Sequence, residues 1–407
     1  MDFEETEEEQ AFRAEARAWL ETHARRRVAG DDPDHFYLSG DTSAEADAEH
    51  VRRCKEWQRT LHDGGWAGIT WPREWGGRSG SGWQARIFNE EMGRFAVSAG
   101  VFAVGIGMVG PTIVAHGTSA QQRLHLSAML RGDEIWCQLF SEPGAGSDLA
   151  GLRTRALRDG DEWVIDGQKV WTSGAHHSDF GILLARSDPD APKHRGITVF
   201  LLDMRTEGVE VRPLRQINGM AHFNEVFLSG VRVPHDQVLG DVNDGWRVAQ
   251  TMLANERSLI GGGGRVGWRD IADAARRLGA TSDPVARQAL ARCYTRLQVI
   301  KWLGWRARSR RDGGLGPESS VLKLAASERI EADADLMLAI QGAAAVLSGD
   351  DAVDRGYWQQ QFLMQWSSRI GGGTEQIQRN VIGERVLGLP SDVRVDKDVP
   401  FRELPHS

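Results

Sequence analysis

The stretch Phe140-Ser-Glu-Pro-Gly-Ala-Gly-Ser-Asp-Leu-Ala-Gly151 lies where a helical sequence pattern gives way to short strand patterns. Its glycines have no Cβ, so the backbone there can approach a ligand closely. Its serine hydroxyls and backbone N–H groups can donate hydrogen bonds to phosphate or ring oxygens. The same residue types are also common in ordinary surface turns. Taken alone, the stretch is equally consistent with a turn and with one wall of a ligand site.

The composition limits the class of protein. The chain has 407 residues, enough for two or three domains, and a formal net charge of −8 that argues against nucleic acid as the main partner. Its three cysteines, Cys54, Cys137 and Cys293, form no C-x-x-C pair, so we expect a reduced, cytoplasmic protein without disulfides or a zinc site. The acidic N-terminus does not resemble a signal peptide, and no apolar run of about 18 residues predicts a membrane span.

Apolar residues recur with the helical period in the first and last thirds of the chain. Phe12, Ala16, Trp19 and Leu20 show this spacing near the N-terminus, with charged residues between them. Glycine and proline separate the helical segments from one another. Helices are expected over residues 3–24, 46–62, 83–94, 112–131, 245–277, 284–311, 318–347, 351–368 and 374–387.

The middle third shows short strand patterns instead. Asp166-Gly167 lies between two such runs and predicts a β-hairpin with a two-residue turn. The sequence therefore predicts an α+β protein with three domains. These are an N-terminal helical domain over 1–135, a middle β domain over 136–240 and a C-terminal helical domain over 241–407. Further strands are expected over 179–185, 197–203, 209–214 and 224–233.

Two local motifs are better explained by structure than by chemistry. Gly262-Gly-Gly-Arg-Val-Gly267 fits the dinucleotide pattern G-x-G-x-x-G, but it lies inside a helical pattern and does not follow a strand. Close helix packing explains its small residues better. His176-His177 is a pair of possible metal ligands, yet no carboxylate or cysteine stands at ligand spacing. We therefore predict loop or strand histidines and no metal site.

Glu256 is the carboxylate that the residue pattern singles out. It follows Met252 by four residues and precedes Ile260 by four, so it lies in the apolar stripe of its predicted helix. Desolvation raises the pKa of a carboxyl group in such surroundings, which is what a general base near neutral pH requires. A buried glutamate paired with an arginine such as Arg257 explains the pattern equally well.

Two separated motifs stand in register: Ser141-Glu-Pro-Gly-Ala-Gly-Ser-Asp148, and Trp171 inside Lys169-Val-Trp-Thr-Ser-Gly174. In their residues and in their separation they resemble the signature of the acyl-CoA dehydrogenase flavoprotein family. Val233-Pro234 and Gly373-Thr-Glu-Gln-Ile-Gln-Arg379 also match. The resemblance covers nearly the whole chain and agrees with its α, β, α order. It implies a β-barrel or sandwich in the middle domain and a four-helix bundle in the C-terminal domain.

The resemblance also implies bound FAD and an acyl-CoA substrate. Ser147 and Arg257 are the positions assigned to the substrate. The flavin ring would lie along Phe140 and Ser141 and beside Trp171. The full set of positions assigned to the cofactor is Phe140, Ser141, Gly146, Ser147, Trp171, Ser173, Gln341, Thr374 and Gln376.

The position of the catalytic base departs from the commonest family pattern. Many members carry the glutamate where this chain has Gly372, and Glu375 lies beyond it as a carboxylate at a helix N-terminus. A minority, of which isovaleryl-CoA dehydrogenase is the known type, place the base on an earlier helix just before an arginine, as in Glu256-Arg257. We expect Glu256 to remove the α-proton of the thioester, with the Gly372 backbone N–H as an oxyanion donor. The missing side chain at Gly372 predicts room for a branched, cyclic or otherwise bulky acyl group.

The resemblance implies partners as well. It implies a homo-oligomer, a dimer or dimer of dimers such as a homotetramer, and an electron-transferring flavoprotein as the acceptor. The segments that hold the flavin diphosphate in relatives are degenerate around Arg277–Pro284 and Gln341–Gly349. Such degeneracy is similar to members that assemble with a sister chain, often on sterol side-chain CoA thioesters, so a hetero-oligomer stays open. Two other functions also stay open: a flavin oxidase or monooxygenase of the same fold acting on a non-CoA substrate, and a non-catalytic partner subunit.

Overall fold

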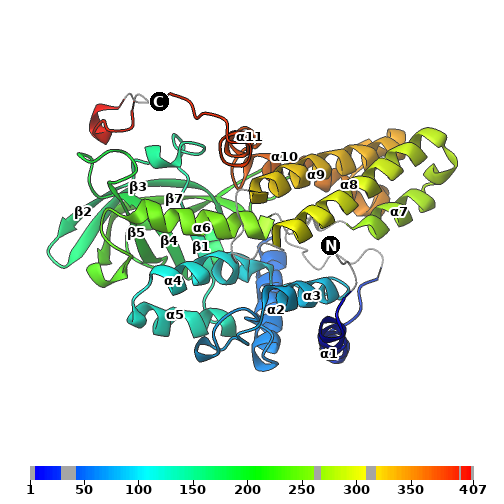
Figure 1. The fold of residues 1–407 in the computed structure, drawn as a ribbon, viewed down its shortest axis with the longest axis horizontal. Helices are drawn as coiled ribbons and strands as arrows, with labels where there is room; N and C mark the ends of the chain where they lie inside the picture. The colour runs from blue at the N-terminus through cyan, green and yellow to red at the C-terminus, as the bar shows by residue number, and fades with distance from the viewer. Residues whose placement is uncertain (1–4, 29–42, 261–266, 309–317, 394–395, 405–407) are drawn as a thin grey trace. The chain divides into compact units, whose positions relative to one another are not determined.

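The first third of the chain is helical, as its sequence period predicts. A computed structural model describes residues 5–28, 43–260, 267–308, 318–393 and 396–404. The predicted helix over 112–131 is divided at Gly117, because Thr118 starts a new helix with a capping box in which its hydroxyl accepts the Gln121 N–H. The N-terminal helices are α1 (Glu7–His23), α2 (Ala44–Asp63), α3 (Gly82–Met92), α4 (Gly110–His116) and α5 (Ser119–Arg131) (Figure 1).

The chain divides into two compact units. Unit 1 comprises Met1–Arg215, Ala221–Ala249 and Pro400–Ser407, and unit 2 comprises Gln216–Met220 and Gln250–Val399. Unit 1 therefore holds both the N-terminal helices and the strands of the middle third. The apolar faces of its first three helices form one core that includes Phe12, Leu20, Trp57, Leu61, Ile87 and Phe88.

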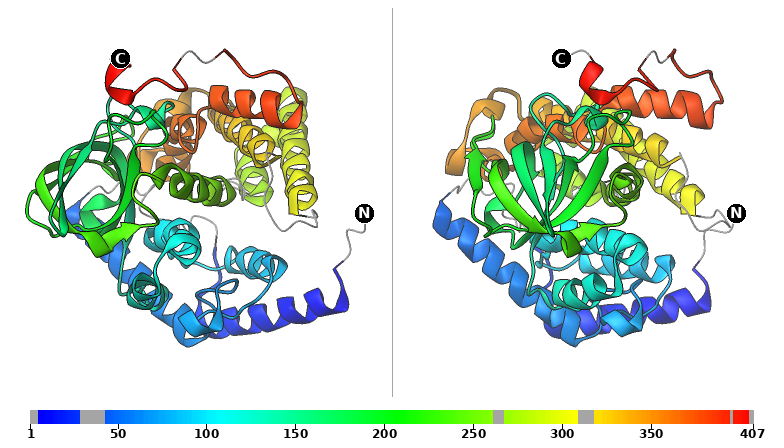
Figure 2. Two further views of the ribbon diagram at one scale, coloured as in Figure 1. Left: turned by 60° about the vertical axis from the view of Figure 1, so that its left-hand side comes forward. Right: turned by 90° about the vertical axis from the view of Figure 1, so that its left-hand side faces the viewer.

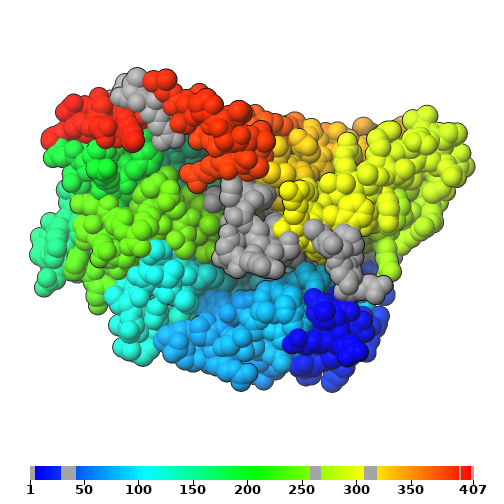
Figure 3. Space-filling view, viewed as in Figure 1, coloured from blue at the N-terminus to red at the C-terminus, as the bar shows by residue number. Residues whose placement is uncertain are grey.

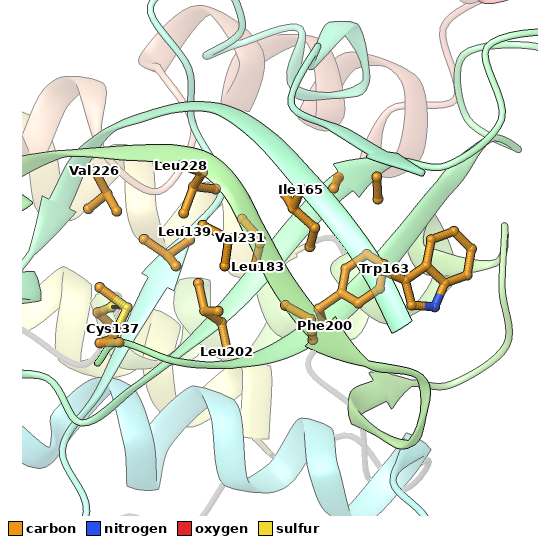
Figure 4. Close-up of a cluster of buried hydrophobic side chains, with 14 of the residues drawn as sticks. Cys137, Leu139, Trp163, Ile165, Leu183, Phe200, Leu202, Val226, Leu228 and Val231 are labelled. Atoms are coloured by element: carbon orange, nitrogen blue, oxygen red, sulfur yellow. Dashed lines mark hydrogen bonds between the residues drawn. The ribbon is translucent and has the colours of Figure 1, made fainter. Parts of the chain in front are cut away.

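Eight strands of unit 1 form a single sheet. Their order is β6-β7-β3-β2-β4-β5-β8, and β1 pairs in parallel with β4. The sheet curves around an apolar core to which Leu139, Ile165, Leu183, Phe200 and Val231 contribute fully buried side chains (Figures 2 and 4). The strands are β1 (Trp136–Leu139), β2 (Arg155–Asp159), β3 (Glu162–Ser173), β4 (Phe180–Arg186), β5 (Ile197–Asp203), β6 (Val209–Leu214), β7 (Phe223–Pro234) and β8 (Val238–Leu239).

The predicted hairpin at Asp166-Gly167 is wrong. Strand β3 runs straight through both residues, and its register with β7 shifts there as in a β-bulge. The Asp166 carboxylate accepts the Gly230 N–H at 2.8 Å, and a Cβ at Gly167 would come within 2.4 Å of Thr154 Oγ1. The hairpin lies earlier, where Gly160 and Asp161 join β2 to β3 and Gly160 has a φ of +63°. Asp-Gly therefore marks a bulge with a close backbone approach.

Helices return after the sheet, as the sequence pattern predicts. The predicted helix over 245–277 is two helices, and most of the Gly262–Gly267 motif lies outside the described residues. In unit 2 a core that includes Ile271, Leu290, Met337 and Trp358 joins α7, α8, α9 and α10. No helix in the described ranges is both long and apolar enough to span a membrane. The helices are α6 (Gly245–Ile260), α7 (Trp268–Arg277), α8 (Pro284–Arg308), α9 (Glu318–Gln341), α10 (Tyr357–Ile370) and α11 (Glu375–Val381).

The segment that begins at Pro400 belongs to unit 1 and lies against the loop between β4 and β5; Figure 3 shows the red atoms of the C-terminal region beside green atoms of the middle third. The Phe401 N–H donates to the Ala191 carbonyl at 3.0 Å, and the Arg186 guanidinium lies 3.7 Å from the centre of the Phe401 ring. The sequence gives no local sign of this contact, because the two partners are about 200 residues apart.

Candidate active site

The loop Phe140–Gly151 is joined to strand β3 by hydrogen bonds. The buried Lys169 ammonium donates to the Phe140 carbonyl at 3.0 Å and to Glu142 Oε1 at 2.8 Å. The Val170 N–H donates to the Ser141 carbonyl at 2.9 Å. The two motifs that carry the family resemblance, Ser141–Asp148 and Lys169–Gly174, are therefore hydrogen-bonded to each other.

Glu142 anchors this loop through a buried ion pair. Besides Lys169, its carboxylate accepts the backbone N–H groups of Arg153 at 2.6 Å and Thr154 at 2.9 Å. Burial opposes its ionisation, but the Lys169 charge and these hydrogen bonds hold the pKa of Glu142 below its usual value. Burial in turn lowers the pKa of Lys169, although Glu142 opposes that shift. The glutamate of the family signature therefore has a structural role here.

The glycine-rich part of the loop is exposed. Glu142 and Ala145 close a tight turn by exchanging two backbone hydrogen bonds of 3.0 Å. Gly146 and Ser147 follow on the surface, and a Cβ built at Gly146 would meet nothing within 4 Å. No protein contact requires a glycine at 146, so the open space there is suited to the close approach of a ligand.

Trp171 combines an unusual backbone with an exposed ring. Its φ is +61°, a left-handed value that is rare for a large side chain. The residue sits where the register of β3 and β7 shifts, between Lys169 and Thr172. The residue is 60% exposed. Its ring packs edge-to-face against the Phe223 ring, with the two ring centres 6.0 Å apart. Backbone strain at an exposed aromatic residue is typical of a functional site. Ser173, two residues on, is half-buried at the end of β3.

The turn before α11 carries the second group of predicted residues, in unit 2. Gly372 and Gly373 have φ values of +66° and +87°, which L-residues with side chains rarely adopt. Thr374 caps α11 by accepting the Ile377 N–H at 3.2 Å, and Gln376 is exposed. Gln378 donates to the Gly372 carbonyl at 2.9 Å and fixes the turn.

Glu375 is occupied by a structural ion pair. Its two carboxylate oxygens each accept a hydrogen bond of 3.0 Å from the Arg369 guanidinium. These bonds hold the pKa of Glu375 below its usual value. Glu375 thus lies in the first turn of α11, as the sequence predicts, and is not the free carboxylate that a catalytic base requires.

Glu256 and the α11 turn share an electrostatic neighbour, Lys323. Lys323 on α9 is fully buried, and its ammonium lies 3.5 Å from the Arg369 carbonyl. Burial lowers the pKa of Lys323, and the carboxylates of Glu375 and Glu256 oppose this shift. Glu256 itself is half-buried, one turn after the fully buried Met252. The sequence does not single out Lys323, because nothing in its local pattern distinguishes a buried lysine from an exposed one.

Two other predicted residues stay without support from geometry. The side chain of Arg257 lies outside the described residues. Gln341 is engaged within unit 2, where it donates to the Met337 carbonyl and accepts from Gln359, both at 3.1 Å. Its predicted contact with the cofactor stays a prediction.

The paired histidines have a carboxylate neighbour that the sequence does not reveal. Asp47 of α2 lies 3.2 Å from His176 and 3.0 Å from His177, although it precedes them by about 130 residues. The two histidines lack a carboxylate partner at ligand spacing in the sequence, but folding brings Asp47 beside them.

Comparisons with known proteins decide the family. Three family models described as the N-terminal, middle and C-terminal domains of acyl-CoA dehydrogenase match residues 6–133, 137–231 and 243–387. The acyl-CoA dehydrogenase IpdE1 of Mycobacterium tuberculosis is 35% identical over 94% of this chain and 98% of its own length. The chain belongs to the acyl-CoA dehydrogenase family. Members of this family are flavoproteins that act on acyl-CoA thioesters, and the chain is an acyl-CoA dehydrogenase with the mixed helical and sheet fold that the sequence predicts.

Three further relatives are similar to this acyl-CoA dehydrogenase over most of its length. FadE34 of Mycobacterium tuberculosis is 42% identical over 82% of this chain. The aligned part makes up 46% of the length of FadE34. The solved structure "Tcur3481-Tcur3483 steroid ACAD" is 32% identical with a TM-score of 0.83, and covers 96% of this chain and 100% of its own. The ChsE4-ChsE5 complex from Mycobacterium tuberculosis is 30% identical with a TM-score of 0.78, and covers 96% and 100%. The division into domains at 135 and 240 stays a prediction.

Proposed function

We propose that this acyl-CoA dehydrogenase uses FAD to introduce an α,β double bond into a bulky acyl-CoA thioester, with Glu256 as the base. The observation that carries the proposal is the backbone of Gly372. Its φ of +66° disfavours any side chain at the position where many relatives carry the catalytic glutamate. The carboxylate must then come from elsewhere, and Glu256 is the residue that matches the alternative family position.

The chain's own groups supply the proton chemistry. Glu256 takes the α-proton, and a positioned carboxylate base contributes about 10²–10⁴-fold to such a step. The Gly372 N–H donates to the thioester oxygen as negative charge develops there. Arg257 and Ser147 bind the substrate. Lys323, which interacts with Glu256, favours the ionised form that accepts a proton.

The residues of unit 1 fit a flavin. An exposed, strained Trp171 offers a flat apolar surface for a ring system, and the open loop at Gly146 and Ser147 offers N–H and hydroxyl donors. When bound, FAD accepts the hydride that leaves the substrate Cβ. The residues proposed to hold it are Phe140, Ser141, Gly146, Ser147, Trp171 and Ser173 from unit 1, and Gln341, Thr374 and Gln376 from unit 2.

The proposed acyl group is branched, cyclic or otherwise bulky, with a steroid-derived group as the first candidate. Glycine at 372 removes a side chain next to the reacting carbons, which leaves volume for substituents. Similarity to a protein named a steroid ACAD points the same way. We further propose an oligomer, with an electron-transferring flavoprotein as acceptor. The names of the two-chain relatives make a hetero-oligomer a candidate beside the homo-oligomer.

A titration of the purified flavoprotein with acyl-CoAs tests this function. Straight-chain, branched and steroid-derived thioesters are added without oxygen, and the visible flavin absorbance is followed. The proposal predicts bleaching that is faster with bulky groups than with short straight chains. A preference for short straight chains would refute the substrate class. Absence of bleaching with every acyl-CoA, or rapid reoxidation by oxygen but not by the electron-transferring flavoprotein, would refute the function.

A further inference from the structure

Three possible metal ligands converge at the first turns of α2. Asp47 comes from α2, and His176 and His177 come from the turn η6 (Ala175–His177) that follows β3. His176 Nε2 lies 3.2 Å from Asp47 Oδ2, and His177 Nε2 lies 3.0 Å from Asp47 Oδ1. One donor atom from each side chain lies within 4.8 Å of the other two. All three residues belong to unit 1, so the cluster does not depend on the placement of unit 2.

The buried amide of Asn224 determines which nitrogen of His176 carries hydrogen. Asn224 Nδ2 donates to the carbonyls of Thr172 at 3.0 Å and His222 at 3.3 Å. Its Oδ1 is therefore the atom that faces His176 Nδ1, 3.0 Å away, and Nδ1 must donate. In a neutral His176, the lone pair of Nε2 then faces a carboxylate oxygen. Two acceptors 3.2 Å apart repel each other unless a cation lies between them.

We propose that Asp47, His176 and His177 bind one divalent transition-metal ion of the Zn²⁺ class. In a tetrahedral site, nitrogen and oxygen ligands at about 2.0–2.2 Å from one ion lie about 3.3–3.6 Å from each other. The two imidazole–carboxylate pairs are 3.2 and 3.0 Å apart, so they need to open by only a few tenths of an ångström to hold one ion. Two imidazoles and one carboxylate suit Zn²⁺, Co²⁺ or Cu²⁺, whereas Mg²⁺ and Ca²⁺ prefer oxygen ligands. The bond from His176 Nδ1 to Asn224 is the kind of outer contact that orients metal-bound histidines.

Among the described residues, Asp47 and His176 keep part of their surface open to a fourth ligand. The side chains of Asp47 and His176 are 26% and 25% exposed, so water can complete a tetrahedral site. A proton on His176 is the competing occupant. That proton would turn His176 into a positively charged imidazolium. Its ring centre would lie 3.8 Å from the ring centre of His177, so only one of the two imidazoles could carry the charge without repulsion. A metal ion instead satisfies both imidazoles and the carboxylate together, and ties α2 to the end of the strand that carries Trp171 and Ser173.

Zinc binding to the holoprotein tests the site. The protein is treated with a chelator and dialysed against buffered Zn²⁺, and bound zinc is measured by elemental analysis beside the thermal unfolding midpoint. We expect one equivalent of zinc and a higher midpoint for the wild type. Asp47→Asn loses both effects, and Asn224→Ser weakens the affinity about 10–100-fold. Glu49→Gln is the matched control, because Glu49 is an exposed carboxylate two residues further along α2 that pairs with Arg52. This variant keeps both effects.

A second measurement does not depend on variants. X-ray absorption at the zinc edge of the wild-type protein should show two imidazole nitrogens in the coordination shell. Wild-type protein that retains no more zinc than Asp47→Asn, or a zinc shell without an imidazole pair, would overturn the proposal. The cluster would then be a hydrogen-bonded clamp that shares protons.

Discussion

Gly372 is the residue on which the proposed placement of the base depends. Its backbone is left-handed, with a positive φ. Composition and spacing do not reveal this, since glycine adopts left- and right-handed backbone conformations about equally well. The sequence indicates only that a glutamate is missing there. The structure adds that the turn, fixed by Gln378, is built for glycine.

A side chain at 372 should destabilise the turn. Gly372→Ala is expected to lower the free energy of unfolding by about 1–2 kcal/mol, the cost of a left-handed L-residue. Gly82→Ala is the control, because Gly82 opens α3 without a positive φ and its added Cβ meets nothing within 4 Å. It should be neutral or slightly stabilising. Chemical denaturation measures both variants, and equal effects would contradict the argument.

Lys323 should control the pH dependence of turnover. Its positive charge favours the ionised form of Glu256, so Lys323→Met should move the acidic limb of the pH–rate profile to higher pH. Glu328→Gln changes an exposed charge on the same helix, where Glu328 pairs with Arg379, and should leave the limb in place. A profile of Lys323→Met that coincides with the wild type would show that Lys323 does not act on the base.

Glu142 should contribute to stability in a pH-dependent way. Removing one partner of its buried pair with Lys169 is expected to cost about 3–5 kcal/mol in Glu142→Gln. Because folding depresses the pKa of Glu142, this contribution is present above its ordinary value of 4.5 and is lost as the pH falls through the folded value.

Denaturation curves across pH measure this effect. The difference between wild type and Glu142→Gln should shrink as the pH falls below about 4.5. Asp159→Asn, which removes an exposed pair with Arg232, should change little at any pH. A difference that is constant across pH would contradict the assignment.

Strand β3 shows where local patterns mislead. Four neighbouring strands match their predicted ranges closely, because each has a compact apolar run. The local pattern predicts a turn at Asp166-Gly167, because that dipeptide favours one. In the sheet the pair instead meets Gly230 and Thr154, and these neighbours in space leave no trace in the local pattern.

Gly167 should therefore tolerate no side chain. Gly167→Ala places a Cβ 2.4 Å from Thr154 Oγ1 and 2.7 Å from Thr154 Cα, and overpacking of this kind costs about 1–3 kcal/mol. Gly160→Asn at the true hairpin is the control, since asparagine accepts a positive φ and the site is open. Thermal unfolding compares the two, and a loss of stability at Gly167 no larger than at Gly160 would contradict the close approach of Thr154.

At the scale of the molecule, the sequence predicts the order of helices and sheet, which the structure confirms, and two motifs of the proposed site. The order follows from periodicity, and the motifs from residues that lie close together in the chain. What escapes prediction depends on contacts between distant segments. Asp47 beside His176, Lys323 near Glu256, and Phe401 on Arg186 are each joined only by folding.

The assignment of Glu256 as the base is the central claim, and the reductive half-reaction of Glu256→Gln tests it most directly. The variant is mixed with a bulky acyl-CoA without oxygen, and flavin bleaching is followed in a stopped-flow instrument. We predict that thioester binding is retained while the bleaching rate falls about 10²–10⁴-fold. Bleaching of Glu256→Gln at the wild-type rate would contradict the account.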